Sequence, residues 1–165
     1  MDETSAIFTR SFKAVVPDGV TPLTESIHET GNMTAVFCFN AAGWGPKLYF
    51  ILKNLKTMPK ELMTFTENGV FEDQKSGWMT RNLFFHWCVD FVHELTYYRL
   101  QLPGHLRTQR ITLITDGHCS RSNISALSYL SNNGVDLVVL PAHKAHVMQP
   151  FDVCMSAPFK SHVSQ

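Results

Sequence analysis

The 165-residue sequence has few charged side chains and no long apolar run. Charged residues make up 17% of the chain, below the roughly 25% of an average globular protein. Hydrophobic residues make up 44% and aromatic residues 12%, which supplies a core and excludes an intrinsically disordered chain. Since no run of about 18 apolar residues exists, no segment is expected to cross a membrane. The first residues also lack the basic and apolar regions of a secretory signal.

An excess of charge of either sign is missing too, because 14 basic side chains are balanced by 14 acidic ones. A free-standing DNA-binding module usually carries a basic footprint, so this balance argues against one. An enzyme that acts on nucleic acid stays open, since a separate module can supply the affinity. The cysteines contain no CxxC pair, and without an export signal we expect four reduced thiols: Cys38, Cys88, Cys119 and Cys154.

The first half of the chain favours strands. No repeat, low-complexity tract or linker interrupts the sequence, which predicts one domain over residues 1–165. Four apolar, β-rich segments are expected to form strands: 2–9, 33–40, 47–52 and the weaker 62–66. Residues 43–46 fit a hairpin loop between the second and third of these.

The second half alternates helices with strands. Apolar residues at spacings of three and four predict a helix over 82–98, with Thr80 as its N-cap. The segments expected to follow are a strand over 110–115, a helix over 122–132, a strand over 135–140 and a helix beginning near Gln149. This order predicts an α/β fold whose mixed sheet has antiparallel early strands, later parallel strands and flanking helices.

Two acidic residues follow the late strands. Asp116 comes directly after the 110–115 strand, and Asp152 comes after the 135–140 strand, in the first turn of the expected last helix. The carboxyl ends of parallel strands share one sheet edge, where open α/β sheets place their sites. Position alone also fits a turn-forming Asp116 and an Asp152 that favours a helix N-terminus. Spacing therefore leaves a functional and a structural interpretation open.

The sequence around these acids favours the functional interpretation. The segments LITDGHCSR and VVLPAHKAHVMQPFDVCMSAPFK resemble the catalytic domain of the DDE superfamily endonucleases, the pogo, Tigger and Jerky-like branch of mariner-type transposases. The residues that match the family pattern are Asp116, Gly117, His118, Pro141, His143, His146, Gln149, Pro150, Asp152 and Val153. The opening MDETSAIF resembles the family's Asn-x-Asp-Glu-Thr-Gly start, which places a third acid at Asp2.

The resemblance implies an RNase H-like fold and metal-dependent cleavage and strand transfer of DNA phosphodiesters. It implies Mg²⁺ or Mn²⁺ as cofactor, with Asp2 and Asp116 bridging the ions and Asp152 binding the second. Two such ions can activate a water molecule and stabilise the leaving oxygen, and oxygen ligands suit them. DNA is the implied partner and the nucleus the implied location, with homodimerisation, as in transposases, a further expectation. Residues expected to support the acids or contact DNA are Glu3, His118, Arg121, His143, Lys144, His146 and Gln149.

The chain also departs from the family pattern. Arg121 stands where the pattern has a histidine after the serine, and Ala142 stands where it has a second proline. Asp2 lies almost at the start of the chain, which ends at Gln165, so we expect a domain incomplete at both termini without its helix-turn-helix module. Such a chain is expected to show little or no strand cleavage by itself. The alternatives are a catalytically inactive transposon remnant and a domesticated DNA- or protein-interaction domain.

Other chemistry is weaker in this sequence. His118, Cys119, His143 and His146 could form a nitrogen–sulfur zinc site, but their spacing is not that of a closed one. No activating triad surrounds Ser120 or Cys119, which argues against a nucleophile.

Two further groups of side chains have competing interpretations. Trp78, Phe84, Trp87 and Phe91 lie at or near helical spacing, which favours the core over a base-stacking platform. For Lys144 and Arg121, the interpretations are contacts with DNA phosphates or solvated surface charges.

Overall fold

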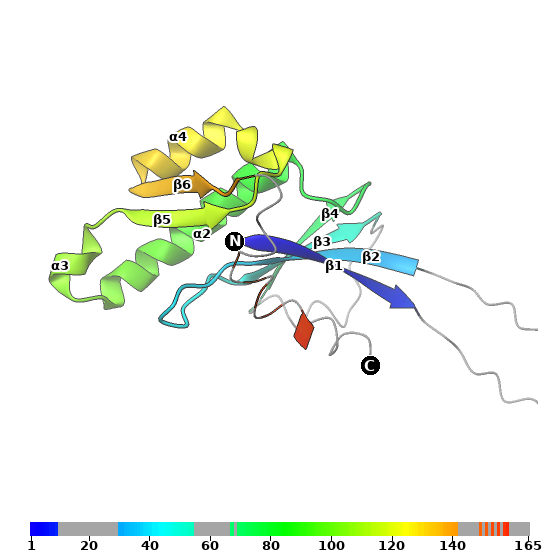
Figure 1. The fold of residues 1–165 in the computed structure, drawn as a ribbon, viewed down its shortest axis with the longest axis horizontal. Coiled ribbons are helices and arrows are strands. Elements are labelled where there is room, and N and C mark those ends of the chain that lie inside the picture. Colours follow the sequence, from blue (N-terminus) through cyan, green and yellow to red (C-terminus); the bar gives the residue numbers. More distant parts are fainter. Residues whose placement is uncertain are drawn as a thin grey trace, which may run out of the picture.

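The structure is a computed structural model that describes residues 1–9, 30–54, 67 and 69–141, with 149, 151, 153, 155, 157 and 158 near the end. Within these residues, two sheets lie side by side and helices cover one face (Figure 1). Early strands are mainly antiparallel, later ones parallel, and helices flank them. The predicted α/β class with a mixed sheet is confirmed, and the arrangement is consistent with an RNase H-like fold.

The larger sheet has the order β1-β2-β3-β4. Its strands are β1 (Asp2–Thr9), β2 (Thr30–Phe37), β3 (Leu48–Lys53) and β4 (Gly69–Gln74). The first three form an antiparallel meander, as predicted, whereas β4 pairs parallel to β3. Strand β4 was missed because its sequence, GVFEDQ, is half polar. The strand predicted over 62–66 lies outside the described residues.

Strand β2 ends earlier than predicted because Asn40 organises the hairpin loop. The Asn40 side-chain oxygen accepts hydrogen bonds from the backbone amides of Ala42 and Trp44, both at 3.0 Å. Gly45 is needed in this loop, since a Cβ atom there would lie 2.3 Å from the carbonyl oxygen of Cys38. The loop thus turns away from strand geometry at Asn40, and the predicted hairpin forms with a longer connection.

The smaller sheet consists of β5 (Ile111–Thr115) and β6 (Val135–Val139), paired in parallel. The connection between them contains a short 3₁₀ helix η1 (Cys119–Ser122) and α4 (Ile124–Asn132). Helix α4 begins later than predicted because Asn123 caps it, its side chain accepting from the amide of Ala126. Gly134 ends the turn after α4 with a φ of +72°, which favours glycine.

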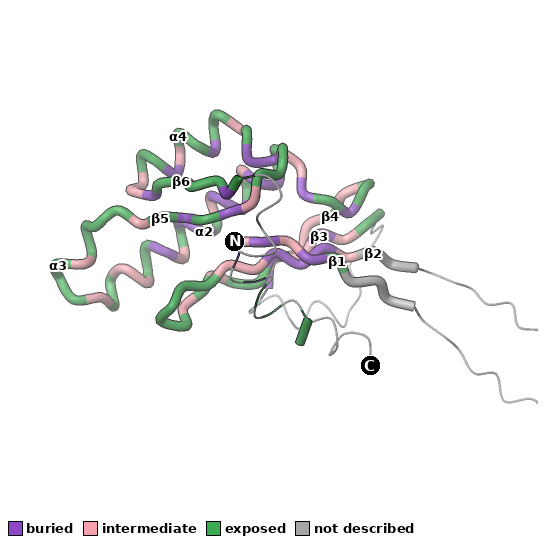
Figure 2. Tube along the Cα trace, viewed as in Figure 1, coloured by how far each residue is buried: buried purple, intermediate pink, exposed green. Residues whose placement is uncertain are grey.

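Helix α2 (Arg81–Gln101) joins the two sheets through one core, and the short α3 (Gly104–Arg107) follows it. Thr80 caps α2 as predicted, its side chain accepting from the amide of Leu83 at 3.2 Å. The buried stripe of α2 packs against both the larger sheet and the β5–β6 unit (Figure 2). Phe84, Trp87 and Phe91 belong to that core, as expected. Trp78 does not, because it precedes the helix and is 56% exposed, which corrects its assignment to the core.

The last described residues follow a helical pattern of backbone hydrogen bonds. In the last segment, the amide of Val153 donates to the carbonyl of Gln149, and that of Met155 to Phe151, which is the helical pattern expected there. Among the described residues, no helix is long and apolar enough to cross a membrane.

Candidate functional site

An acidic cluster forms where β1 begins and β5 ends. Asp2 and Glu3 open β1, and Asp116 follows β5 directly. The amino group of Met1 donates to the carbonyl of Ile114 at 2.8 Å, which holds the two strand ends together. One carboxylate oxygen from each of the three acids lies within 4.8 Å of the others. Tertiary packing thus brings residues more than a hundred positions apart into one site.

Arg121 lies beside the carboxylates. Its Nη2 donates to Glu3 Oε2 at 2.6 Å and to Asp116 Oδ1 at 3.1 Å. Its other two nitrogens donate as well. Nε donates to the hydroxyl oxygen of Thr115 at 2.9 Å, and Nη1 donates to that of Ser120 at 2.8 Å. Each of the three guanidinium nitrogens therefore donates at least one hydrogen bond.

The burial of Arg121 shows that the interpretation of this residue as a solvated surface charge was wrong, while its expected contact with DNA stays a prediction. Its side chain is only 3% exposed, and its guanidinium carbon lies 4.9 Å from the centre of the Phe84 ring. Residue 121 ends up inside because η1 turns the chain back over α2 directly after Asp116. A buried guanidinium needs anionic partners, and Glu3 and Asp116 supply them.

His118 and Ser120 support this arrangement from η1. The backbone amide of Ser120 donates to Nδ1 of His118, and the Ser120 hydroxyl lies 2.8 Å from the same atom. Since Arg121 can only donate, the Ser120 hydroxyl accepts from it and turns its own hydrogen toward His118. Ser120 is 1% exposed, so this serine–histidine pair is a support for Arg121 and not an accessible nucleophile.

The thiols nearby offer no nucleophile either. Cys119 is exposed, and Nδ1 of the neighbouring His118 is engaged by Ser120, whereas Cys88 is buried in the core. Burial raises the pKa of Cys88 to about 12, although the nearby Arg121 charge acts in the opposite direction. Cys38, Cys88 and Cys119 are all free, as predicted, while Cys154 lies outside the described residues.

The donor set of the cluster fits a hard divalent cation. It offers carboxylate oxygens, and three carboxyl groups face a single guanidinium. Glu3 Oε1 is buried and has no hydrogen-bond partner among the described residues, so it is an acceptor that a cation or a donor could satisfy. Asp2 is 7% exposed and accepts from the amide of Glu3 at 2.9 Å, which orients its carboxylate.

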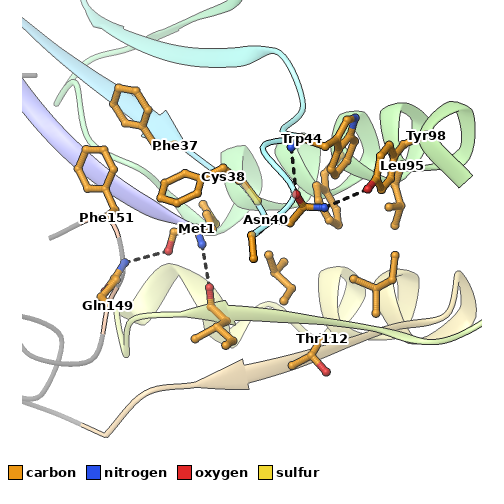
Figure 3. A pocket seen from close by; sticks show the side chains of 16 residues that line it. Met1, Phe37, Cys38, Asn40, Trp44, Leu95, Tyr98, Thr112, Gln149 and Phe151 are labelled. Carbon is orange, nitrogen blue, oxygen red and sulfur yellow. Dashed lines mark hydrogen bonds between the residues drawn. The ribbon is translucent and has the colours of Figure 1, made fainter. Parts of the chain in front are cut away.

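The remaining predicted site residues divide into two groups. Gln149 is 2% exposed, and its side-chain nitrogen donates to the carbonyl of Met1 at 2.9 Å (Figure 3). It therefore braces the start of β1 next to Asp2, and its expected role, support of the acids or contact with DNA, stays a prediction. Four predicted residues lie outside the described part of the chain: His143, Lys144, His146 and Asp152.

Glu3 was underestimated from the sequence. It was expected to support the acids or contact DNA, yet its carboxylate is a full member of the cluster and a partner of Arg121 at 2.6 Å. The sequence does place a second acid directly after Asp2. Because successive side chains of a strand point to opposite faces, however, Glu3 would be expected to point away from Asp2.

Comparison with known proteins settles the family. Residues 30–165 match the DDE superfamily endonuclease family. The chain belongs to this family. The matched residues include Asp116. Asp2 and Glu3 precede the matched range, and the tertiary structure brings them to the site.

One curated relative of this DDE superfamily endonuclease chain is a protein of Cochliobolus lunatus named MFS-type transporter clz9. It is 23% identical over 138 residues, which make up 81% of this chain and 14% of that protein. The chain thus corresponds to a small part of the relative's length. No solved structure matches the chain.

Proposed function

We propose that the domain binds Mg²⁺ or Mn²⁺ at the acidic cluster and cleaves DNA phosphodiesters as part of a transposase-derived endonuclease. The observation that supports this most is the convergence of Asp2 and Glu3 on Asp116. Membership of the endonuclease family makes DNA the preferred substrate. Two metal ions bound there would activate a water molecule and stabilise the leaving oxygen.

The chain's own residues have distinct parts in this proposal. Asp2, Asp116 and Asp152 would hold the metal, with Glu3 as a further oxygen donor through Oε1, which no described residue engages. Arg121 would orient the carboxylates of Glu3 and Asp116 by its hydrogen bonds. Such orientation matters, because a displacement of about 1 Å in an active site can cost about a hundredfold in rate.

A second function is supported by Arg121 itself. A positive charge already lies among the carboxylates, 2.6 Å from Glu3, and it compensates part of the charge that a metal would neutralise. A catalytically inactive domain that keeps the fold and its internal ion pairs is therefore the other candidate. Because of this competition, we expect weak metal binding and slow cleavage by the 165-residue chain.

Metal binding and cleavage can be tested together. Mn²⁺ is titrated into the chain in a calorimeter, and nicking of supercoiled plasmid is followed with Mg²⁺ or Mn²⁺. Asp116→Asn should remove both signals, whereas the matched variant Asp136→Asn, at an exposed ion pair far from the cluster, should keep both. Mn²⁺ binding that is lost in Asp116→Asn without any nicking would favour the inactive domain. Equal binding by all three proteins would refute the metal site.

The proposed setting is the nucleus, with DNA as partner and a homodimer as the working form. The chain has no net charge, which gives it little affinity for DNA through counterion release. A separate basic module would then have to supply the affinity. A fluorescent fusion and analytical ultracentrifugation would test the location and the dimer.

A further inference from the structure

Trp78 is exposed, unlike the other two tryptophans of the chain. Trp87 is buried in the core, and Trp44 stacks on Tyr98 with the ring centroids 4.3 Å apart. Trp78 is 56% exposed, and no aromatic ring among the described residues stacks on it. Packing within the fold therefore does not account for most of this large apolar side chain.

The backbone on both sides of Trp78 is fixed. On one side, the hydroxyl of Thr34 donates to the carbonyl of Gly77 at 2.7 Å in a buried hydrogen bond. On the other side, Met79 is 5% exposed and Thr80 caps helix α2. The fold thus holds the two neighbours of Trp78 inside and presents the indole ring between them to solvent.

This segment lies on the same face of the larger sheet as Glu3 of the acidic cluster. Thr34 is opposite Ser5 in the β1–β2 ladder, and Ser5 follows Glu3 by two residues. Residues two apart in a strand share a face at about 6.8 Å, and a directly opposite pair shares it at about 5 Å. Through Thr34, the Gly77 carbonyl is therefore within about 15 Å of Glu3. Ser5 is exposed, so the surface between them is open to solvent.

The start of α2 connects the same segment to the acidic cluster from the other side. The side-chain nitrogen of Asn123 donates to the carbonyl of Arg81 at 2.8 Å, which joins the starts of α2 and α4 (Figure 1). Phe84, three residues after Arg81, lies 4.9 Å from the guanidinium carbon of Arg121. Trp78 precedes Arg81 by three residues. The exposed indole thus belongs to a rigid segment beside the acidic cluster.

Two cations flank Trp78 in the sequence. Lys75 and Arg81 are exposed, and neither forms an ion pair with a described residue. Cationic side chains position a nucleic-acid strand through its phosphates, whereas aromatic rings stack on bases of any sequence. Bases inside a duplex are stacked on their own neighbours, so an indole on the surface can stack only on an unpaired base. An exposed ring between two unpaired cations therefore fits a single strand.

We propose that Trp78 stacks on an unpaired DNA base near the phosphodiester at the acidic cluster, while Lys75 and Arg81 contact neighbouring phosphates. The choice of DNA as the partner rests on the proposed function. A DNA strand rises about 3.4 Å per nucleotide, so the distance from this segment to Glu3 corresponds to about four nucleotides. Stacking would fix the position of the strand relative to the carboxylates. It requires no bound metal and selects no base sequence.

The test titrates the full chain with a single-stranded DNA of about twelve thymidines, in low salt with EDTA. Stacking should quench the tryptophan fluorescence saturably. Trp78→Ala should abolish this quenching and weaken binding about tenfold, measured by the anisotropy of labelled DNA. Trp78→Phe should keep most of the affinity, because the smaller ring still stacks. Tyr97→Ala is the matched control: it removes a ring that is 57% exposed near the other end of α2, and its binding should not change.

An abasic DNA of the same length and charge separates stacking from phosphate contacts. The unchanged chain should bind it about tenfold more weakly than the intact DNA, whereas Trp78→Ala should bind both equally. Lys75→Gln and Arg81→Gln should each reduce the slope of log affinity against log salt by about 0.7. Arg107→Gln, in α3 beyond the far end of α2, should leave the slope unchanged.

Three results would overturn the proposal. These are the absence of saturable quenching in the unchanged chain, equal affinity of Trp78→Ala and the unchanged chain, and equal binding of intact and abasic DNA. Because EDTA removes metal ions, the outcome does not depend on the proposed metal site. Trp78-dependent binding by a chain that takes up no Mn²⁺ would refute the proposed function and support the stacking. Nicking by a chain whose DNA binding does not depend on Trp78 would do the reverse.

Discussion

The two ends of the β5–β6 sheet carry arginine–carboxylate pairs of the same length in opposite surroundings. At one end, Arg110 Nη2 lies 2.6 Å from Asp136 Oδ1, and both side chains are 51% exposed. At the other end, Arg121 Nη2 lies 2.6 Å from Glu3 Oε2, with side chains 3% and 14% exposed. The two pairs have the same nitrogen–oxygen distance, but they differ in how far their side chains are buried.

The difference follows from solvation. Water and salt already stabilise the separated charges of Arg110 and Asp136, so their pairing gains little. The charges at the buried end have lost their water, and each depends on the other for compensation. The exposed pair is thus a surface contact, whereas the Arg121 network holds the start of β1 against η1.

The largest expected effect comes from removing the buried guanidinium. Arg121→Met leaves the half-buried carboxylates of Glu3 and Asp116 without their guanidinium partner, which should lower the free energy of unfolding by about 3–5 kcal/mol. Arg110→Met should leave the midpoint of urea unfolding unchanged within error. Circular dichroism during urea titration measures both. Similar losses of unfolding free energy in the two variants would contradict the predicted difference between the buried and the exposed pair.

A smaller effect concerns metal affinity, and it rests on the proposed metal site. Arg121→Gln removes a positive charge that lies beside the carboxylates, so Mn²⁺ should bind at least about tenfold more tightly. Arg110→Gln should bind Mn²⁺ like the unchanged chain. Calorimetric titration gives the dissociation constants. Weaker binding in Arg121→Gln would show that the arginine positions the ligands more than it repels the ion.

A third effect is a change in pKa at the exposed end. The hydrogen bonds from Arg110 lower the pKa of Asp136. Asp136 therefore stabilises the fold above its unfolded-state pKa of about 3.9, and this contribution is lost as the pH falls through the lowered folded-state value. In Arg110→Met, the pKa of Asp136 should rise toward about 3.9, as an NMR titration would show. An unchanged pKa would mean that the pair does not form in solution.

The smallest expected effect is that of salt. At about 1 M NaCl the screening length falls to about 3 Å, so the pKa of Asp136 should move part of the way back to its ordinary value. The destabilisation caused by Arg121→Met should stay the same, because salt screens buried pairs much less. Urea titrations of both proteins at low and high salt measure the second part. Salt-dependent destabilisation would indicate that Arg121 is open to solvent.

Local patterns in the sequence were sufficient for most of the fold. The apolar spacing from Leu83 to Leu95 and the capping residue Thr80 define α2, because helix periodicity and caps act within a few residues. The strand patterns located β1, β2, β3, β5 and β6. The end of β2 is shifted where Asn40 bonds to nearby amides, and the start of α4 is shifted where Asn123 caps the helix. Strand β4 escaped because its polar residues follow no clear alternation.

The candidate site was predictable only in part. Asp2 and Asp116 were selected from motifs, and the structure brings them together with Glu3. The position of Arg121 was not predictable, since a single arginine after a strand is usually solvated.

The sequence by itself determined the α/β class, the main helix and the motif that marks Asp116, since each of these depends on residues close together in the chain. Tertiary structure alone decided that Arg121 pairs with Glu3, 118 positions away. Periodicity and capping are local forces, whereas burial of a charge depends on which distant segments exclude water around it. Whether Arg121 is a surface charge or the centre of a buried network is therefore settled by packing.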